Sequence, residues 1–170
     1  SSLLLVFFVL LLCLSFSSPF FSSAASDVYK VQLSLEPGAV SNYFSRLGLG
    51  QSTGVGFPGE SAGLLPMKER WRPIEVATMS YGYGLSVTAL QLAQTYAVLG
   101  SGGVKRQTSL LKLDANNSNN NDFVERVMDK SVAADVLAMI EKVTGDKGTA
   151  KRAKVPGYRV GGKTGTVHKA

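Results

Sequence analysis

The chain opens with an unbroken apolar run, from Leu3 to Leu14, and a serine-rich stretch follows it. A proline and a cluster of small residues close this stretch, which is the order of parts found in a secretory signal peptide. A membrane-spanning helix needs about 20 apolar residues, and the serines interrupt the run before that length. We therefore expect residues 1–27 to be a signal peptide or membrane-anchor-like leader, and residues 28–170 to contain the folded part.

Two segments of the folded part repeat apolar residues at helical spacing and carry helix end signals. The first runs from Val40 to Leu47, and Gly48 follows at the place where a left-handed cap ends a helix. Thr88 is a good N-cap for a second helix, which we expect to continue to Leu99. The apolar face of this second helix would consist of Ala89, Leu92, Ala93, Tyr96 and Leu99.

A third helix is predicted over residues 131–143. Its apolar stripe would consist of Val132, Val136, Met139, Ile140 and Val143. Strands are predicted at 107–113, where strand-forming residues cluster, and at 158–163, where apolar and basic residues alternate. The glycine-rich segment 50–66 and the asparagine-rich segment 114–122 are expected to be irregular, exposed loops. This mixture of helices and strands predicts the α/β class.

Charge and rare residues exclude several kinds of function. The net charge is +6, and the excess of basic residues gathers after Asp146 without a series of aromatic stacking platforms between them. We therefore expect a solvated basic loop and no nucleic-acid partner. Cys13 is the only cysteine and His168 the only histidine, so neither an intrachain disulfide nor a two-histidine metal site can form. We expect no cofactor and no metal, and we expect His168 to be a solvated residue rather than part of a catalytic triad.

The predicted final strand leads into Lys163, Thr164, Gly165 and Thr166, which are the candidate substrate-binding residues. On a strand that borders a cleft, the lysine would offer a fixed cation to a substrate carboxylate, and the threonines would offer hydroxyls. Gly165 would let the substrate approach the backbone. Each charge-assisted hydrogen bond is worth about 1.5 to 3 kcal/mol, which orients a substrate but does not transfer an acyl group. A nucleophile is therefore needed elsewhere.

Two other patterns compete with this interpretation. Residues 157–164 also match the phosphate-binding loop G-x-x-x-x-G-K-[ST], but such a loop must follow a buried strand, and residues 151–156 have no strand pattern. The only Ser-x-x-Lys runs from Ser109 to Lys112, and on a strand these two side chains point to opposite faces. The only Ser-x-Asn begins at Ser118, in the asparagine-rich segment. We therefore identify no catalytic nucleophile.

Several stretches resemble, in order and spacing, the transpeptidase domain of class B penicillin-binding proteins, particularly the cell-division D,D-transpeptidases. These stretches are YFSRLGLG (43–50), GESAGLLP (59–66), SYGYGLSVT (80–88), LQLA (90–93) and GYRV running into KTGT (157–166). The resemblance implies a β-lactamase/transpeptidase-like domain, in which an antiparallel sheet is flanked by helices. It also implies that Lys163, Thr164 and Thr166 hold the terminal carboxylate of the substrate, with the Thr166 N–H as one oxyanion-hole donor. By the same resemblance, we expect a supporting role in the cleft for Tyr81, Gly82, Tyr83 and Gly84.

The resemblance further implies a reaction. In that family a serine attacks the penultimate D-alanine carbonyl of a peptidoglycan stem peptide, D-alanine leaves, and an amine of a neighbouring stem takes the acyl group. β-Lactams acylate the same serine. This chain departs from the pattern, because the leader stands where the family's nucleophile helix is expected and Ser23-Ala24-Ala25 replaces the family's Ser-Ser-Asn. The family's strands after Lys-Thr-Gly are also not present, so we expect an incomplete domain that is inactive alone.

The hypothesis from sequence is thus a partial transpeptidase domain, residues 28–170, that takes part in cell-wall and septum synthesis outside the cytoplasm. Its expected partners are a peptidoglycan stem peptide or a β-lactam, together with membrane proteins of the division complex. The alternatives are a secreted, non-enzymatic basic binding protein and a phosphate-loop nucleotide binder.

Overall fold

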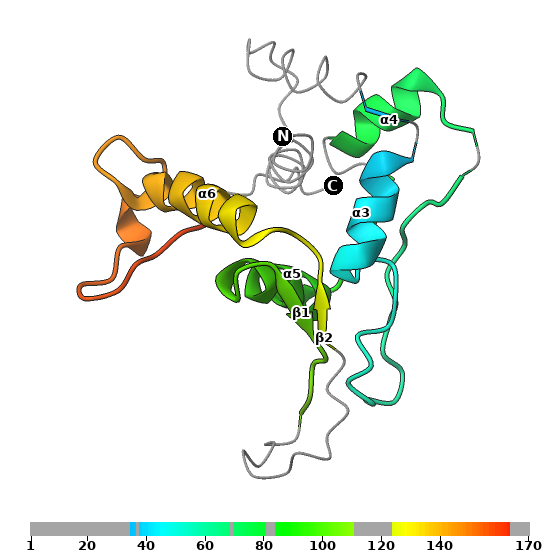
Figure 1. The fold of residues 1–170 in the computed structure, drawn as a ribbon, viewed down its shortest axis with the longest axis horizontal. Helices are drawn as coiled ribbons and strands as arrows, with labels where there is room; N and C mark the ends of the chain where they lie inside the picture. Colours follow the sequence, from blue (N-terminus) through cyan, green and yellow to red (C-terminus); the bar gives the residue numbers. More distant parts are fainter. Residues whose placement is uncertain (1–34, 37, 69, 81–83, 111–123, 164–170) are drawn as a thin grey trace, which may run out of the picture.

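The computed structural model describes residues 35–36, 38–68, 70–80, 84–110 and 124–163 (Figure 1). Its helices are α3 (Ala39–Leu47), α4 (Pro73–Ser80), α5 (Ala89–Gly100) and α6 (Lys130–Glu141), with the 3-10 turns η1 (Lys142–Thr144) and η2 (Lys151–Ala153). The strands β1 (Val104–Arg106) and β2 (Val124–Arg126) pair antiparallel, with Lys105 opposite Glu125. The predicted mixture of helices and antiparallel sheet is confirmed. None of the described helices is long and apolar enough to cross a membrane.

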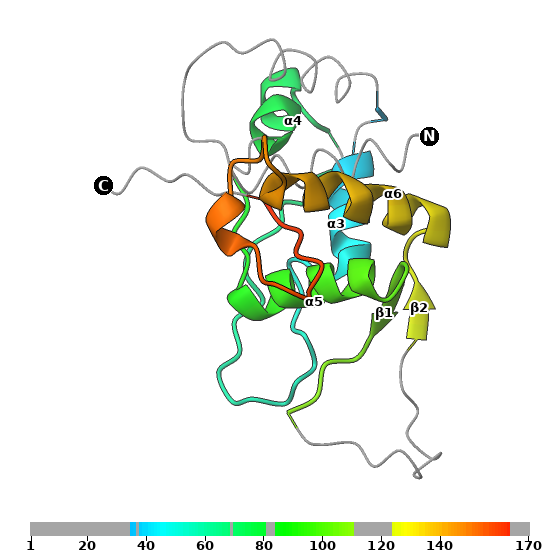
Figure 2. The ribbon, with the colours of Figure 1, turned by 90° about the vertical axis from the view of Figure 1, so that its left-hand side faces the viewer.

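The helices α5 and α6 form the centre of the arrangement. They lie one above the other in contact, and the β1–β2 pair lies at one end of this stack (Figure 2). Helix α3 packs against α5, and α4 lies further along the same side of the molecule (Figure 1). After η1, the chain continues through η2 and returns toward α6 (Figure 2).

The predicted helix from Val40 to Leu47 is confirmed as α3, and it anchors the core. Its four buried apolar side chains follow the spacing i, i+3, i+4 and i+7, and they are Val40, Tyr43, Phe44 and Leu47. Gly48 ends the helix with φ of 97°, a left-handed conformation that favours glycine. The rest of the buried apolar cluster comes from Leu49, Met79, Val98, Leu99, Val127, Met128, Ala133, Val136 and Ile140. Residues from α3, α5 and α6 therefore share one core.

The second predicted helix is confirmed as α5, and its predicted apolar face is right at Leu99, which is buried, and at Tyr96, which packs against the core, but wrong elsewhere. Thr88 does cap the helix, and together with Gln91 it forms a reciprocal capping box. The buried residues of α5 are Gln91, Gln94, Thr95, Val98 and Leu99. The predicted face included Ala89 and Ala93, which are exposed. Burial is possible for the polar residues because their hydrogen-bonding groups find partners inside the protein, and apolar periodicity does not register such residues.

The third predicted helix is confirmed as α6 and continues into η1. Its buried side chains are Ala133, Val136 and Ile140. Met139, which we placed in the stripe, is exposed. The buried stripe thus includes the small Ala133, on the side of the helix away from Met139.

The predicted strands are wrong where the structure describes them. Residues 107–110 of the strand expected at 107–113 are irregular, residues 111–113 lie outside the described residues, and a strand occurs earlier, as β1. Residues 158–163, where we predicted a strand, contain no strand in the described part of the chain. The leader 1–27, which includes Cys13, and the segment 114–122 lie outside the described residues.

The base of the β1–β2 pair is fixed by a close backbone approach at Gly103. Its carbonyl oxygen accepts the amide N–H of Val127 at 2.9 Å and that of Met128 at 3.3 Å. A Cβ at Gly103 would lie 2.2 Å from the Met128 carbonyl oxygen, so no larger residue fits. The tight turn out of α5 thus sets the register of the two strands.

Candidate functional site

The segment that ends at Lys163 lies against the C-terminal end of α6. The Gly162 N–H donates to the Ile140 carbonyl oxygen, in the last turn of the helix, at 3.2 Å. The Thr144 hydroxyl lies 3.0 Å from the Val160 carbonyl oxygen and the same distance from the Glu141 carbonyl oxygen. These bonds explain why the predicted strand does not form, because α6 and η1 supply the partners that a neighbouring strand would have supplied.

A third link joins this segment to α6 through side chains. Arg159 Nη2 lies 2.7 Å from Glu141 Oε1, although the arginine is largely exposed. An exposed ion pair adds only about 0.5 kcal/mol, so it guides the segment more than it stabilises the fold. The hydrogen bonds at Val160 and Gly162 therefore hold the segment more firmly than this ion pair does.

Gly161 brings the segment close to α6. A Cβ at this position would lie 2.9 Å from Ile140 Cγ1 and 3.3 Å from the Glu141 backbone nitrogen. At Gly162, the next residue, a Cβ would meet nothing within 4 Å. A larger residue would therefore clash with α6 at position 161 but would find open space at position 162.

Lys163 is half-buried at the end of this segment. Burial lowers the pKa of its ammonium group below the ordinary value of 10.5, since desolvation disfavours the charged form. A partly desolvated cation attracts a carboxylate more strongly than a fully hydrated one. The other predicted substrate-binding residues, Thr164, Gly165 and Thr166, lie outside the described residues.

Of the four residues predicted to support the cleft, the structure describes Gly84 alone. Gly84 is exposed and has φ of 81°, which favours glycine. Two residues later, the Ser86 N–H and carbonyl oxygen pair with the backbone of Leu64, both at 2.8 Å. Tyr81, Gly82 and Tyr83 lie outside the described residues.

Gln91 is a structural residue that our sequence reasoning missed. Its buried amide donates to the carbonyl oxygens of Gln51 at 2.7 Å and Ala62 at 2.8 Å, and it accepts the Thr88 N–H at 2.9 Å. The glycine-rich segment is thereby tied to the start of α5, which follows the Gly84 region directly. The pattern Thr-x-x-Gln is a capping box, and it could have identified Gln91 as more than a surface residue.

The glycine-rich segment has a second internal tie, at Glu60. Its carboxylate accepts hydrogen bonds from the hydroxyls of Ser52 and Thr53 and from the Thr53 N–H. These bonds, the Ser52 bond foremost, lower the pKa of Glu60 below 4.5. Thr53 is buried as a result, so the segment is irregular as predicted but is not exposed throughout.

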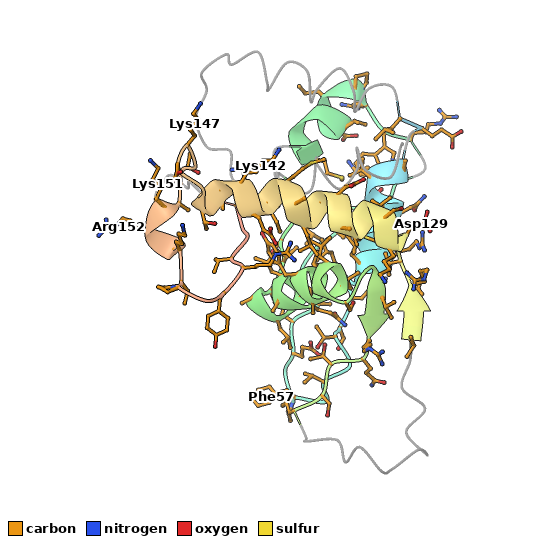
Figure 3. The ribbon with its side chains drawn as sticks, turned by 60° about the vertical axis from the view of Figure 1, so that its left-hand side comes forward. Phe57, Asp129, Lys142, Lys147, Lys151 and Arg152 are labelled. Carbon is orange, nitrogen blue, oxygen red and sulfur yellow. The ribbon has the colours of Figure 1, made fainter. Side chains whose placement is uncertain are left out.

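The basic residues near the C-terminus surround the far end of α6. Figure 3 shows Lys142, Lys147, Lys151 and Arg152 at this end and Asp129 at the other. All of these cations are exposed, as we expected of a solvated basic loop. Positive charge at a helix C-terminus and negative charge at its N-terminus both favour the helix dipole.

The rival patterns gain no support from the structure. A phosphate-binding loop at 157–164 needs a preceding buried strand, whereas η2 and an exposed irregular stretch precede it. Ser109 is exposed in an irregular segment, and Lys112, Ser118 and His168 lie outside the described residues. Among the described residues, no three His, Cys, Asp or Glu side chains gather as metal ligands would.

Comparison with known proteins gives the same family along most of the chain. The family model for the penicillin binding protein transpeptidase domain matches residues 14–170. Peptidoglycan D,D-transpeptidase FtsI of Escherichia coli is 42% identical over 147 residues, which are 86% of this chain and 24% of the relative. The probable peptidoglycan D,D-transpeptidase PbpC of Pseudomonas aeruginosa is 38% identical over 149 residues, or 88% of this chain and 26% of the relative. The chain thus spans about a quarter of the length of these curated relatives.

The fold has a close counterpart among solved structures. The apo transpeptidase domain of penicillin-binding protein 3 from Burkholderia pseudomallei superimposes with a TM-score of 0.74 at 42% identity. The match covers 84% of this chain and 42% of that one. A structure described as a peptidoglycan glycosyltransferase from Burkholderia ambifaria gives the same TM-score and identity.

Proposed function

Because the chain belongs to the penicillin-binding protein transpeptidase family, we propose that Lys163 and the threonines after it hold the terminal carboxylate of a peptidoglycan stem peptide for D,D-transpeptidation. The observation that carries this proposal is the placement of Lys163. Lys163 is half-buried, and the segment before it is fixed by hydrogen bonds to Ile140 and Thr144. A cation held in this way is preorganised to receive an anion.

In the proposed reaction, a serine hydroxyl attacks the penultimate D-alanine carbonyl and D-alanine leaves with the proton that the serine gives up. An amine of a neighbouring stem then displaces the serine oxygen and forms the cross-link. Thr164 and Thr166 would donate hydroxyl hydrogens to the substrate carboxylate, and the Thr166 N–H would stabilise the oxyanion. Gly165 would leave room for the peptide backbone.

Ser-x-x-Lys, the motif that would supply the nucleophile for this chemistry, occurs once in the sequence, at Ser109 to Lys112. Ser109, in the only Ser-x-x-Lys, is exposed in an irregular segment rather than on a helix that faces a cleft. We therefore assign substrate holding, and not turnover, to the 170-residue chain.

The proposal is tested by titrating the 170-residue chain with a peptide that ends in D-Ala-D-Ala and with the same peptide as a C-terminal amide. Nuclear magnetic resonance would follow the Gly162 amide and the Lys163 ammonium signals. The acid should bind, and the amide should bind at least about ten-fold more weakly, since a charge-assisted bond is lost. Lys163→Gln should abolish the difference, whereas the exposed Lys147→Gln should preserve it. Equal binding of acid and amide would contradict the proposal.

Fluorescent penicillin separates substrate holding from catalysis. The chain should acquire no covalent label that survives denaturation, because acylation needs an activated serine. A stable label would show that a serine of this chain reacts after all, and mapping the labelled peptide would identify it. That result would show that the chain can be acylated, contrary to our assignment. It would not test the role of Lys163, which the peptide titration tests separately.

We assign the leader, residues 1–27, to carrying residues 28–170 to the outer face of the cell membrane, where the proposed substrate lies. Membrane proteins of the division complex are the proposed partners there. Fractionation of cells that express the chain, with mass spectrometry of its N-terminus, tests both export and cleavage. Recovery of the intact chain in the cytoplasm alone would contradict this assignment.

A further inference from the structure

We propose that a polar pocket between α3, the glycine-rich segment and β1 binds a small polyanion that carries carboxylate or phosphate groups. The pocket has a volume of about 440 Å³, which suits a small molecule. Its chemistry comes from Arg46, Gln51, Gln94, Lys105, Arg106 and Glu125. None of the residues that line it belongs to the proposed substrate-binding segment, so this inference stands apart from the proposed function.

The pocket carries an excess of positive charge. It is lined by three cationic side chains, Arg46, Lys105 and Arg106, and by one carboxylate, Glu125, which leaves two positive charges in excess. Arg46 Nε lies 3.6 Å from Glu125 Oε1, and both side chains are substantially exposed. Such a long, exposed pair neutralises little of the field in the pocket. A ligand with two negative charges would therefore match the lining better than a neutral one.

The cations are positioned before any ligand arrives. Lys105 Nζ donates to the Arg46 carbonyl oxygen at 3.2 Å, and an ammonium group has three donors, so this bond uses one. Arg46 Nη2 donates to the Arg126 carbonyl oxygen at 3.1 Å. Each bond ties α3 to the β1–β2 pair across the pocket. These side chains have thus already lost conformational entropy in the folded protein, and a ligand that binds them loses less free energy to ordering.

Gly48 leaves the space in which two of these polar groups come together. A Cβ at Gly48 would lie 3.1 Å from Gln94 Oε1 and 3.2 Å from Lys105 Nζ. Gln94 is itself buried, and its Nε2 donates to the Arg106 carbonyl oxygen at 3.2 Å. A buried amide beside a positioned ammonium can recognise a hydroxyl next to an acidic group. Hydroxylated polyanions, such as sugar phosphates and hydroxypolycarboxylates, have this chemistry.

The test is a titration of the 170-residue chain with citrate, glucose 6-phosphate and inorganic phosphate at constant ionic strength. Chemical shifts of the Gly48 amide and the Gln94 side-chain amide would report on the pocket. We expect saturable shifts with citrate or glucose 6-phosphate, and weaker ones with inorganic phosphate, which lacks the hydroxyl-bearing carbon frame. Comparison of the two organic anions distinguishes a carboxylate ligand from a phosphorylated one.

Charge variants decide whether binding belongs to the pocket. The double variant Lys105→Gln, Arg106→Gln should weaken binding by at least about ten-fold. The control, Lys151→Gln with Arg152→Gln, removes the same charge from the exposed basic loop and should leave the affinity unchanged. Equal weakening by both variants, or no saturable shift at Gly48, would overturn the proposal. If the pocket double variant fails to fold, Arg106→Gln alone, at an exposed position, provides the same comparison with Arg152→Gln.

Discussion

The Thr144 hydroxyl lies 3.0 Å from the carbonyl oxygen of Val160, three residues before the lysine that we assign to substrate binding. This contact joins residues 16 apart in sequence and fixes the approach to Lys163 from the side of η1. The position of the lysine therefore depends on a residue that would not touch the substrate.

Replacing Thr144 by valine tests this dependence. The variant keeps the shape of the side chain but loses the hydroxyl, and we expect the free energy of unfolding to fall by about 1 kcal/mol. Loosening the segment should also expose Lys163, so its pKa should rise toward 10.5. Urea denaturation and a titration of the lysine ammonium signal measure the two effects. Thr149→Val, at an exposed threonine in the same region, should change neither.

Gly161→Ala should disturb the same region by overpacking. The added methyl group would meet Ile140 Cγ1 at 2.9 Å, and relief of this contact should cost about 1 to 3 kcal/mol. The amide of residue 162 should then exchange with solvent faster, because its bond to the Ile140 carbonyl oxygen is strained. Gly162→Ala is the matched control, since a Cβ there meets open space. Equal losses of stability in both variants would point to a backbone conformation that disfavours alanine at both positions, instead of to the contact.

Gln91→Leu should be among the most destabilising single changes in α5. It leaves the carbonyl oxygens of Gln51 and Ala62 and the Thr88 N–H without their partner, and we expect a loss of about 3 kcal/mol. Gln94→Leu removes one such bond and should cost clearly less. Thermal unfolding of both variants gives the comparison. Similar losses would show that the three bonds of Gln91 do not act together.

The lowered pKa of Glu60 predicts that the folded protein loses stability in acid. Its pKa is lowered in the folded protein, so the unfolded state binds a proton first as the pH falls. The stability that the ionised carboxylate contributes is therefore complete above about pH 4.5 and is lost as the pH falls through the folded pKa. Glu60→Gln should lower the free energy of unfolding at neutral pH and make little difference in strong acid. Asp135→Asn, at an exposed acid on α6, serves as the control.

The helices were predictable because their signals are local. The stripe from Val40 to Leu47, the glycine after it and the cap at Thr88 each act within a few residues, and each is confirmed. The burial of Gln91 was not predictable from apolar periodicity, because it depends on carbonyl groups that are 29 and 40 residues away in sequence. Local pattern finds the element but not the polar residues that it buries.

The strands were misplaced for a related reason. The alternation at 158–163 is compatible with a strand, but a strand also requires a partner, and this segment instead bonds to Ile140 of α6 and Thr144 of η1. β1 is short and exists because Gly103 brings Val127 and Met128 to its start. Strand pairing is decided by such distant contacts, which a single sequence does not display.

The closed base of the β1–β2 pair makes the stretch between its strands a permissive site for engineering. Gly103 helps to set the strand register at the end away from this stretch, so chain added between Leu110 and Val124 lengthens a connection between two strands that are already paired. The entropy of closing a loop grows slowly with its length, by about 0.6 kcal/mol for each doubling. A fluorescent reporter or affinity tag placed there would follow the protein without altering the helices that position Lys163.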